Sequence, residues 1–108
     1  MDYFNELNCA VTICDMNGVI VYCNQKSRQT FAKDGELIGK NLKDCHPQKA
    51  WEKVLHLLQT GESNSYTIEK NGQKKFIHQT PWRVNGEIKG LIEFSMIIPF
   101  EMPHFLRL

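Results

Sequence analysis

The sequence predicts a small α+β domain in which a helical middle section interrupts an antiparallel sheet. Three Asn-Gly pairs, at residues 17–18, 71–72 and 85–86, each separate two strand-like runs. Asn-Gly is the strongest short-range signal for a β-hairpin, because a type I′ turn needs positive φ at both central residues. The three pairs divide the chain into an early hairpin, a helical middle and a late three-stranded meander.

Length and composition indicate one globular domain. The chain has 108 residues, of which 42% are hydrophobic and 23% are charged, and its net charge is +1. These values are ordinary for a protein with one core. Lys70, Lys74 and Lys75 flank the second turn and are interpreted as a solvated strand edge, so no nucleic-acid partner is expected. Met1 and the fit of one domain to the length suggest a nearly complete protein, although a domain boundary would look the same.

The sequence carries no membrane or secretion signal. No apolar run approaches the ~18–20 residues of a spanning helix, and the N-terminus has no signal-peptide core. We therefore expect a cytoplasmic protein without a membrane partner. In a reducing compartment, cysteines without a Cys-x-x-Cys pair are expected to be small buried hydrophobic residues. They are Cys9, Cys14, Cys23 and Cys45.

The first hairpin follows a short arm. Residues 1–8 suit an N-terminal arm or cap, or one helical turn, and residues 9–14 predict a strand. Residues 19–23 predict the returning strand, and their nearly continuous apolar character suggests that both faces are covered. Asn24 breaks this strand and can cap a short helix over residues 25–31.

The middle section contains one strongly predicted helix. The short helix is expected to end near residues 34–35, and residues 36–42 suit another turn or two. A longer helix starts with Pro47 at its first position, where a missing N–H costs nothing, and runs to about Gln59 before Gly61. At 100° per residue, its apolar residues share one face. They are Trp51, Val54, Leu55 and Leu58.

Three strands are predicted at residues 64–70, 74–84 and 87–98. In the second strand one face carries Phe76, His78, Thr80, Trp82 and Val84, and the other carries Ile77, Gln79 and Pro81. Which face is buried stays open, because a shift of one residue moves every side chain to the other face. Pro81 argues for a bulge, an edge position or an early strand end. In the third strand one face carries Ile88, Gly90, Ile92, Phe94 and Met96. Because this is the apolar face, Glu93 is predicted to point outward.

The last ten residues, 99–108, form an apolar tail that contains two prolines. The prolines argue against a helix or a regular strand. Because exposed apolar tails are disfavoured, we expect the tail to pack on its own domain or, with a slight preference, on a partner. Its interface candidates are Phe100, Met102 and Phe105.

Three motifs in order carry a resemblance to a known family. Residues 15–24, Asp-Met-Asn-Gly-Val-Ile-Val-Tyr-Cys-Asn, are similar to a first hairpin with the pattern Asp…Gly…Ile…Tyr…Asn. Residues 37–42 resemble a Gly-centred step before a long helix, and residues 85–93 resemble a last hairpin. Together they resemble the PAS domain family. The likeness covers residues 8–98, so the PAS-like domain is placed at residues 9–98, between the arm and the tail.

The resemblance implies a five-stranded antiparallel sheet in the order 2-1-5-4-3, with helices on one face and a pocket between them. Family members use this pocket for haem, flavin or small metabolites, or fill it with side chains. Many form homodimers through the N-terminal segment and the outer sheet face. We therefore expect a sensory module that binds a small molecule or a partner protein and signals through homodimer contacts. Its signalling partner would be reached in trans or lie in a longer chain.

The candidate pocket residues are Cys45, His46, Trp51, Val54, Leu55, Leu58, His78, Trp82 and Phe94. His46 has a functional interpretation, as a ligand to haem iron or a metal or as a polar contact at the pocket mouth. Its structural interpretation is a cap of the long helix. His56 points away from the apolar face and is a poor haem ligand. His78 would orient a ligand only if its strand face lines the pocket.

Two other functions stay open. Cys45 beside His46 would suit a haem- or redox-sensing module, with His46 as a weak metal candidate. A small enzyme with a cavity would need a buried acid or base, for which the late strands offer Glu93 and His78. No Walker, Rossmann or nucleophile-elbow pattern is present, so a non-enzymatic protein is expected. No motif specifies haem or flavin: Asn8-Cys9-Ala10 lacks the Arg of the Asn-Cys-Arg motif of flavin photoreceptors.

Overall fold

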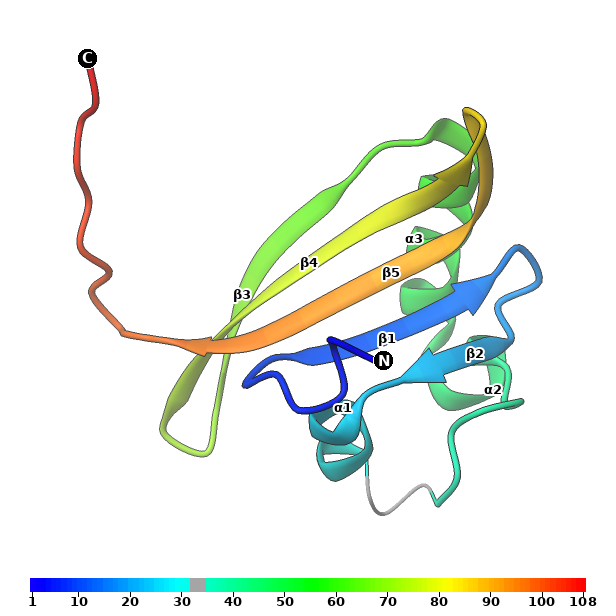
Figure 1. Cartoon of the computed structure of the whole chain (residues 1–108), viewed down its shortest axis with the longest axis horizontal. Coiled ribbons are helices and arrows are strands. Elements are labelled where there is room, and N and C mark those ends of the chain that lie inside the picture. Colours follow the sequence, from blue (N-terminus) through cyan, green and yellow to red (C-terminus); the bar gives the residue numbers. More distant parts are fainter. Residues whose placement is uncertain (32–34) are drawn as a thin grey trace.

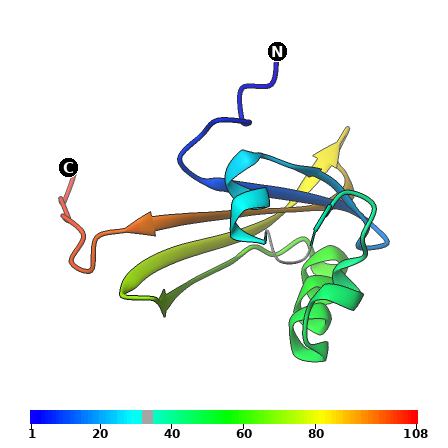
Figure 2. The ribbon, with the colours of Figure 1, turned by 90° about the horizontal axis from the view of Figure 1, so that it is seen from below.

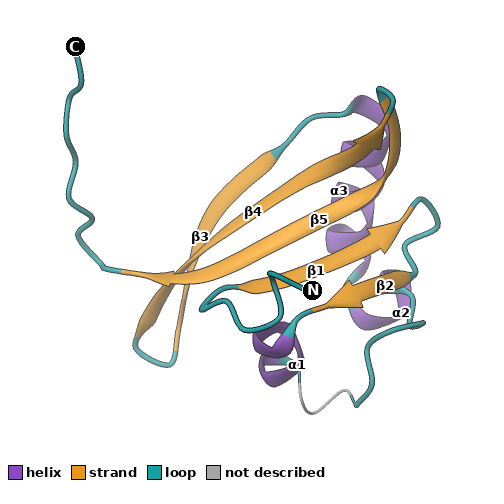
Figure 3. Ribbon diagram, in the orientation of Figure 1, coloured by secondary structure: helices purple, strands orange, loops and turns teal. Residues whose placement is uncertain are grey.

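The computed structural model describes residues 1–31 and 35–108, and it confirms the predicted α+β class (Figure 3). The predicted end of the first short helix, near residues 34–35, lies partly outside the described residues. The strands are β1 (Ala10–Asp15), β2 (Ile20–Cys23), β3 (Asn64–Lys70), β4 (Gln73–Val84) and β5 (Glu87–Ile98). The helices are α1 (Gln25–Thr30), α2 (Leu42–Cys45) and α3 (Gln48–Thr60).

The strands form one antiparallel sheet in the order β2-β1-β5-β4-β3, as the resemblance implied. β5 is the central strand, between β1 and β4. Figure 1 shows α3 behind the sheet and the N-terminal arm in front of β1, and Figure 2 shows the same two elements on opposite sides of the sheet. The sheet therefore has a helix-facing side, called the inner face below, and an outer face.

Two of the three Asn-Gly turns have the predicted geometry. Asn71 and Gly72 have φ values of 52° and 76°, and Asn85 and Gly86 have φ values of 51° and 85°. The first turn differs, because only its Gly18 has a positive φ. There the Asp15 carboxylate orders the loop by accepting hydrogen bonds from the backbone N–H groups of residues 17 and 19, at 2.9 and 3.0 Å.

Helix α3 supplies much of the core on the inner face. It begins one residue later than predicted, because Pro47 is its N-cap, and it ends at Gly61, whose φ of 78° is left-handed. The buried residues of α3 pack with Cys14 and Leu91 of the sheet; they are Trp51, Val54, Leu57 and Leu58. Leu57 is fully buried, whereas Leu55 is only partly buried. The buried stripe is therefore turned towards Leu57 relative to the prediction.

The prediction that Glu93 points outward is wrong. Leu91 belongs to the core beneath α3, and side chains alternate along a strand, so Glu93 shares the inner face. Phe94 and Ile92 consequently lie on the outer face, opposite Val11 and Ile13 of β1. The sequence pattern failed here because the outer face is also apolar, so apolar alternation alone could not identify the buried side.

The outer face contains a cross-strand brace. The Trp82 indole N–H of β4 donates to the carbonyl oxygen of Cys14 on β1, at 3.0 Å, across Gly90 of β5. A Cβ at Gly90 would collide with that carbonyl group and with the indole nitrogen, which explains the glycine in this strand. Pro81 fits within β4 because β3 pairs with β4 only as far as Gln79, leaving the N side of Pro81 without a ladder partner there.

The two chain ends differ in how they are held. The C-terminal tail leaves the end of β5 and extends away from the sheet (Figure 1). Its predicted interface residues Phe100, Met102 and Phe105 are all more than half exposed. The N-terminal arm, by contrast, is bonded to the domain through Asn24 and Tyr22. Packing of the tail on a partner stays a prediction.

Asn24 ties the arm, β1 and α1 together. Its side chain is fully buried and makes four hydrogen bonds. The side-chain oxygen accepts from the backbone N–H of Val11 at 2.9 Å and of Ser27 at 3.0 Å, the second being the predicted helix cap. The side-chain NH₂ donates to the carbonyl oxygens of Phe4 at 2.7 Å and Cys9 at 2.8 Å. Both halves of the amide are thus used, which only Asn can do at this size.

We expect Asn24→Asp to lower the free energy of unfolding by at least about 3 kcal/mol, because a buried carboxylate oxygen would then face two carbonyl oxygens. Urea unfolding followed by circular dichroism measures this loss. Asn41→Asp is the matched control: that side chain also accepts from a backbone N–H and donates to a carbonyl, at 2.9 and 3.0 Å, but at the surface. Equal losses in the two variants would contradict the role of Asn24.

Candidate functional site

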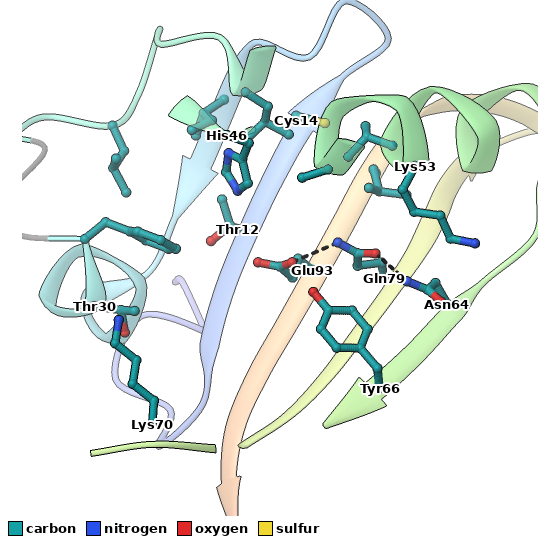
Figure 4. Close-up of a pocket in the computed structure, with 17 residues that line it drawn as sticks. Thr12, Cys14, Thr30, His46, Lys53, Asn64, Tyr66, Lys70, Gln79 and Glu93 are labelled. Atoms are coloured by element: carbon teal, nitrogen blue, oxygen red, sulfur yellow. Dashed lines mark hydrogen bonds between the residues drawn. The ribbon is translucent and has the colours of Figure 1, made fainter. Parts of the chain in front are cut away.

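A cavity of about 560 Å³ lies between the inner face of the sheet and the helices (Figure 4). Its apolar wall comes from both sheet and helix side; the residues are Cys14, Ile20, Phe31, Leu37, Leu42, Ala50, Val54 and Leu91. Its polar lining comes mainly from the late strands; the residues are Thr12, Thr30, His46, Lys53, Asn64, Tyr66, Lys70, Gln79 and Glu93. A cavity with an apolar wall and a few placed polar groups is the usual form of a small-molecule site.

Three polar side chains form a chain across β3, β4 and β5. Asn64 donates through its NH₂ group to the Gln79 side-chain oxygen at 3.0 Å, and Gln79 donates to the Glu93 carboxylate at 3.0 Å. The strand register explains the alignment, because Gln79 lies directly opposite both Asn64 and Glu93. An ionised carboxylate only accepts, so Glu93 fixes which way both amides face.

Tyr66 carries a hydroxyl of the cavity lining whose acidity is weakened by its surroundings. The pKa of Tyr66 is raised by burial and, to a smaller extent, by the negative charge of Glu93. Figure 4 shows the Tyr66 hydroxyl directed towards the Gln79–Glu93 pair. The pKa of the Cys14 thiol is also raised, mainly by burial and to a smaller extent by nearby carboxylates. Both groups therefore present neutral side chains to the cavity at neutral pH.

His46 lies in the step between α2 and α3 and reaches the cavity. Its Nδ1 atom is buried and has no hydrogen-bond partner among the described residues. The alternative role as a side-chain cap of α3 is not seen, because α3 has Pro47 at its N-cap and no side-chain cap bond. Figure 4 shows the imidazole directed into the cavity, towards Thr12. A buried nitrogen without a partner is costly, and a bound molecule could satisfy it.

The structure brings only part of the predicted pocket together. His46 and Val54 line the cavity, whereas Trp51 and Leu58 are packed in the core and Leu55 lies against it. The side chain of Cys45 lies outside the described part of the chain. His78, Trp82 and Phe94 are on the outer face and do not line the cavity, which corrects their predicted place. His78 instead meets Ser65 at 2.6 Å.

Sequence reasoning missed most of the polar lining. Thr12 and Tyr66 were not among the candidates. Gln79 was named only on the alternative face of its strand, and Glu93 only as a possible acid of a small enzyme. One signal was available for Glu93: it is a charged residue between the apolar residues Ile92 and Phe94 in the middle of a long strand. His56 points away from the cavity as predicted, half exposed and 3.0 Å from Glu62.

Among the residues whose side chains the structure describes, no three His, Cys, Asp or Glu come together as metal donors. Over the same residues, none of the helices is long and apolar enough to cross a bilayer.

The family assignment follows from comparison with family models. The PAS domain model matches residues 8–95 of this chain. The chain therefore belongs to the PAS domain family, and the resemblance of its motifs is confirmed. No curated protein matches it significantly.

Solved structures with the same fold include PAS domains of signalling proteins. The PAS domain of the histidine kinase ThkA is 20% identical, with a TM-score of 0.68 over 83% of this chain and 99% of that chain. A sensory box sensor histidine kinase from Vibrio cholerae is 20% identical, with a TM-score of 0.70 over 88% and 86%. VqmA bound to DPO is 23% identical, with a TM-score of 0.70 over 90% of this chain but only 55% of VqmA. At these identities the likeness shows the fold.

We expect Glu93→Gln to lower the pKa of Tyr66, because the substitution removes the negative charge that disfavours the phenolate. NMR titration of ring-labelled tyrosine measures this change. Tyr22 is an internal control: burial and its hydrogen bond to Asp2 raise its pKa to about 12, and this should not change. A Tyr66 pKa that stays constant or rises would show that Glu93 does not act on this hydroxyl.

Proposed function

We propose that this PAS domain is a sensory module that binds a small molecule in the inner cavity and passes the signal on through its outer sheet face. The observation that carries the proposal is the cavity itself: an apolar wall, a fixed carboxylate and a buried His46 nitrogen without a partner. Such a combination suits a ligand better than a packed core. The solved complex of VqmA with DPO supports ligand binding by a protein that contains this fold.

Binding is favoured over catalysis by the chemistry of the lining. The two hydroxyl or thiol groups with perturbed acidity, Tyr66 and Cys14, have raised pKa values and are poor nucleophiles at neutral pH. Glu93 is held by Gln79 within a chain of neutral amides. We therefore propose a protein without enzymatic activity of its own, which acts on a signalling protein in trans or within a longer chain.

Signal transfer would use the alternation of β5. Glu93 contacts the cavity, whereas its neighbours Ile92 and Phe94 lie on the outer face. A ligand that moves Glu93 must therefore shift backbone that also carries the outer face. This is a shift between populations that differ in their outer contacts. Haem bound through His46 is a second candidate, favoured by the free Nδ1 atom of that side chain.

Native mass spectrometry of freshly purified protein should show an added small-molecule mass that denaturing conditions release. Ala50→Phe should lose this mass, because Ala50 lines the cavity and a phenyl group would fill it. Lys49→Phe, at the adjacent exposed position, should keep it. Equal retention by both variants would place the bound molecule elsewhere.

A Soret band that His46→Ala abolishes would identify the ligand as haem.

We further propose a homodimer that pairs through the outer face. The partly exposed apolar residues there are Ile13, Phe76, Ile92, Phe94 and Met96. A contiguous apolar face of this kind usually marks an interaction surface. The tail residues Phe100, Met102 and Phe105 are candidates for extending it.

Phe94→Glu should convert the proposed dimer into a monomer, because a charge would then be buried at the centre of the apolar face. Size-exclusion chromatography with light scattering measures the mass. Lys49→Glu, on the helix side and exposed, should remain dimeric. A wild-type monomer at every concentration tested would exclude pairing of two copies, and the outer face would then be tested against other proteins.

A further inference from the structure

The polar lining of the cavity points to a particular class of ligand. Building on the proposed function, we propose that the cavity binds a small organic cation, in which an apolar body carries an ammonium group that Glu93 accepts. The inference rests on three features: the unneutralised carboxylate of Glu93, the acceptor groups around it and the apolar wall.

Glu93 is a half-buried carboxylate with unused acceptor capacity. It projects from the middle of β5, the central strand, and receives one hydrogen bond from a described side chain, that of Gln79 at 3.0 Å. A carboxylate has about four lone-pair sites and donates none, so most of its capacity is open to a ligand. A buried charge without a counter-charge is costly, and a cationic partner removes that cost.

No ion pair joins Glu93 to a cation among the described residues. The ion pairs among the described residues are His56 with Glu62 and Lys89 with Glu87, both on the surface. Lys53 and Lys70 line the cavity but are exposed. Figure 4 shows the Lys53 ammonium group directed away from Glu93, and that of Lys70 beside Thr30 on the other side of the cavity. Glu93 is therefore the negative, half-buried part of the lining, whereas Lys53 and Lys70, called the rim below, are its exposed and positive part.

Besides the Gln79 amide and the Tyr66 hydroxyl, two further lining groups can accept hydrogen bonds. Figure 4 shows Glu93, Thr12 and His46 converging on the same part of the cavity. In its neutral Nε2–H tautomer, His46 offers its unpartnered Nδ1 as an acceptor. An ammonium group supplies up to three N–H donors, which suits this set, whereas a carboxylate or phosphate would be repelled by Glu93.

The remaining wall suits the apolar body of such a molecule. Ile20, Leu37, Leu42 and Leu91 supply aliphatic surface beside the acceptors. A volume of about 560 Å³ admits a molecule of moderate size. The positive rim would tolerate a carboxylate at the far end, so the same ammonium chemistry could come from a simple amine or from an amino acid. The experiment separates these sources.

Four matched probes test the class by ¹⁵N-edited NMR titration of the full chain: 2-phenylethylamine, 2-phenylethanol, phenylacetate and phenylalanine. The amine should shift the Gln79 side-chain amide and bind about tenfold or more tightly than the alcohol, since it forms a charge-assisted bond. Glu93→Gln should abolish this preference. Glu87→Gln, on the same strand but exposed and paired with Lys89, is the matched control and should keep it. Phenylalanine binding more tightly than the amine would assign the source to amino acids.

Three results would overturn the assignment: equal affinity for amine and alcohol, tighter binding of phenylacetate, or no binding by any probe. The mass retained in native spectrometry then separates this inference from the proposed function. If the wild type retains a neutral or acidic molecule and Ala50→Phe does not, the proposed sensory function is supported and the proposed cationic ligand is excluded. A protein that neither retains a molecule nor binds any of the four probes would remove both.

Discussion

The buried amide of Asn24 is the interaction on which the rest of the domain depends. Four backbone groups from three segments meet at this side chain: the arm at Phe4, β1 and the residue before it at Val11 and Cys9, and α1 at Ser27. In water these backbone groups would be solvated, but inside the fold each needs a partner, and one fully buried amide supplies all four. Ser27 in turn bonds Thr12 at 2.6 Å, so the same network reaches the cavity lining.

The cavity exists because the sheet is polar where the core ends. Near α3 the inner face is filled by Cys14 and Leu91, which pack against the helix. Further along the strands, Gln79 and Glu93 replace apolar side chains and bond to each other. A polar pair cannot be covered by an apolar helix without loss of solvation, so packing stops there and leaves a space.

The order of elements and the outward position of His56 could be predicted from the residues alone, because turn signals, proline and helical periodicity are local. The sheet topology was predicted only through the resemblance to the PAS family. The side of β5 that faces the helices could not, because both faces carry apolar residues and only the packing of Leu91 under α3 decides between them. Because of this uncertainty, Phe94, Trp82 and His78 were predicted to line the pocket and Glu93 was predicted to point outward. His46 was a pocket candidate with a helix cap as its alternative; it lines the cavity, and Pro47 is the N-cap of α3.

The alternation along β5 also limits how this protein can change. Residues that line the cavity and residues of the outer face, the proposed ligand and partner surfaces, succeed each other one by one, as in Leu91, Ile92, Glu93 and Phe94. Exchanging a continuous stretch of this strand with that of a relative would therefore transplant both specificities together. New ligand preference with unchanged assembly requires substitution at every second position. Chimaeras with junctions inside β5 should consequently fail to alter one face alone, whereas point substitutions on one face should succeed.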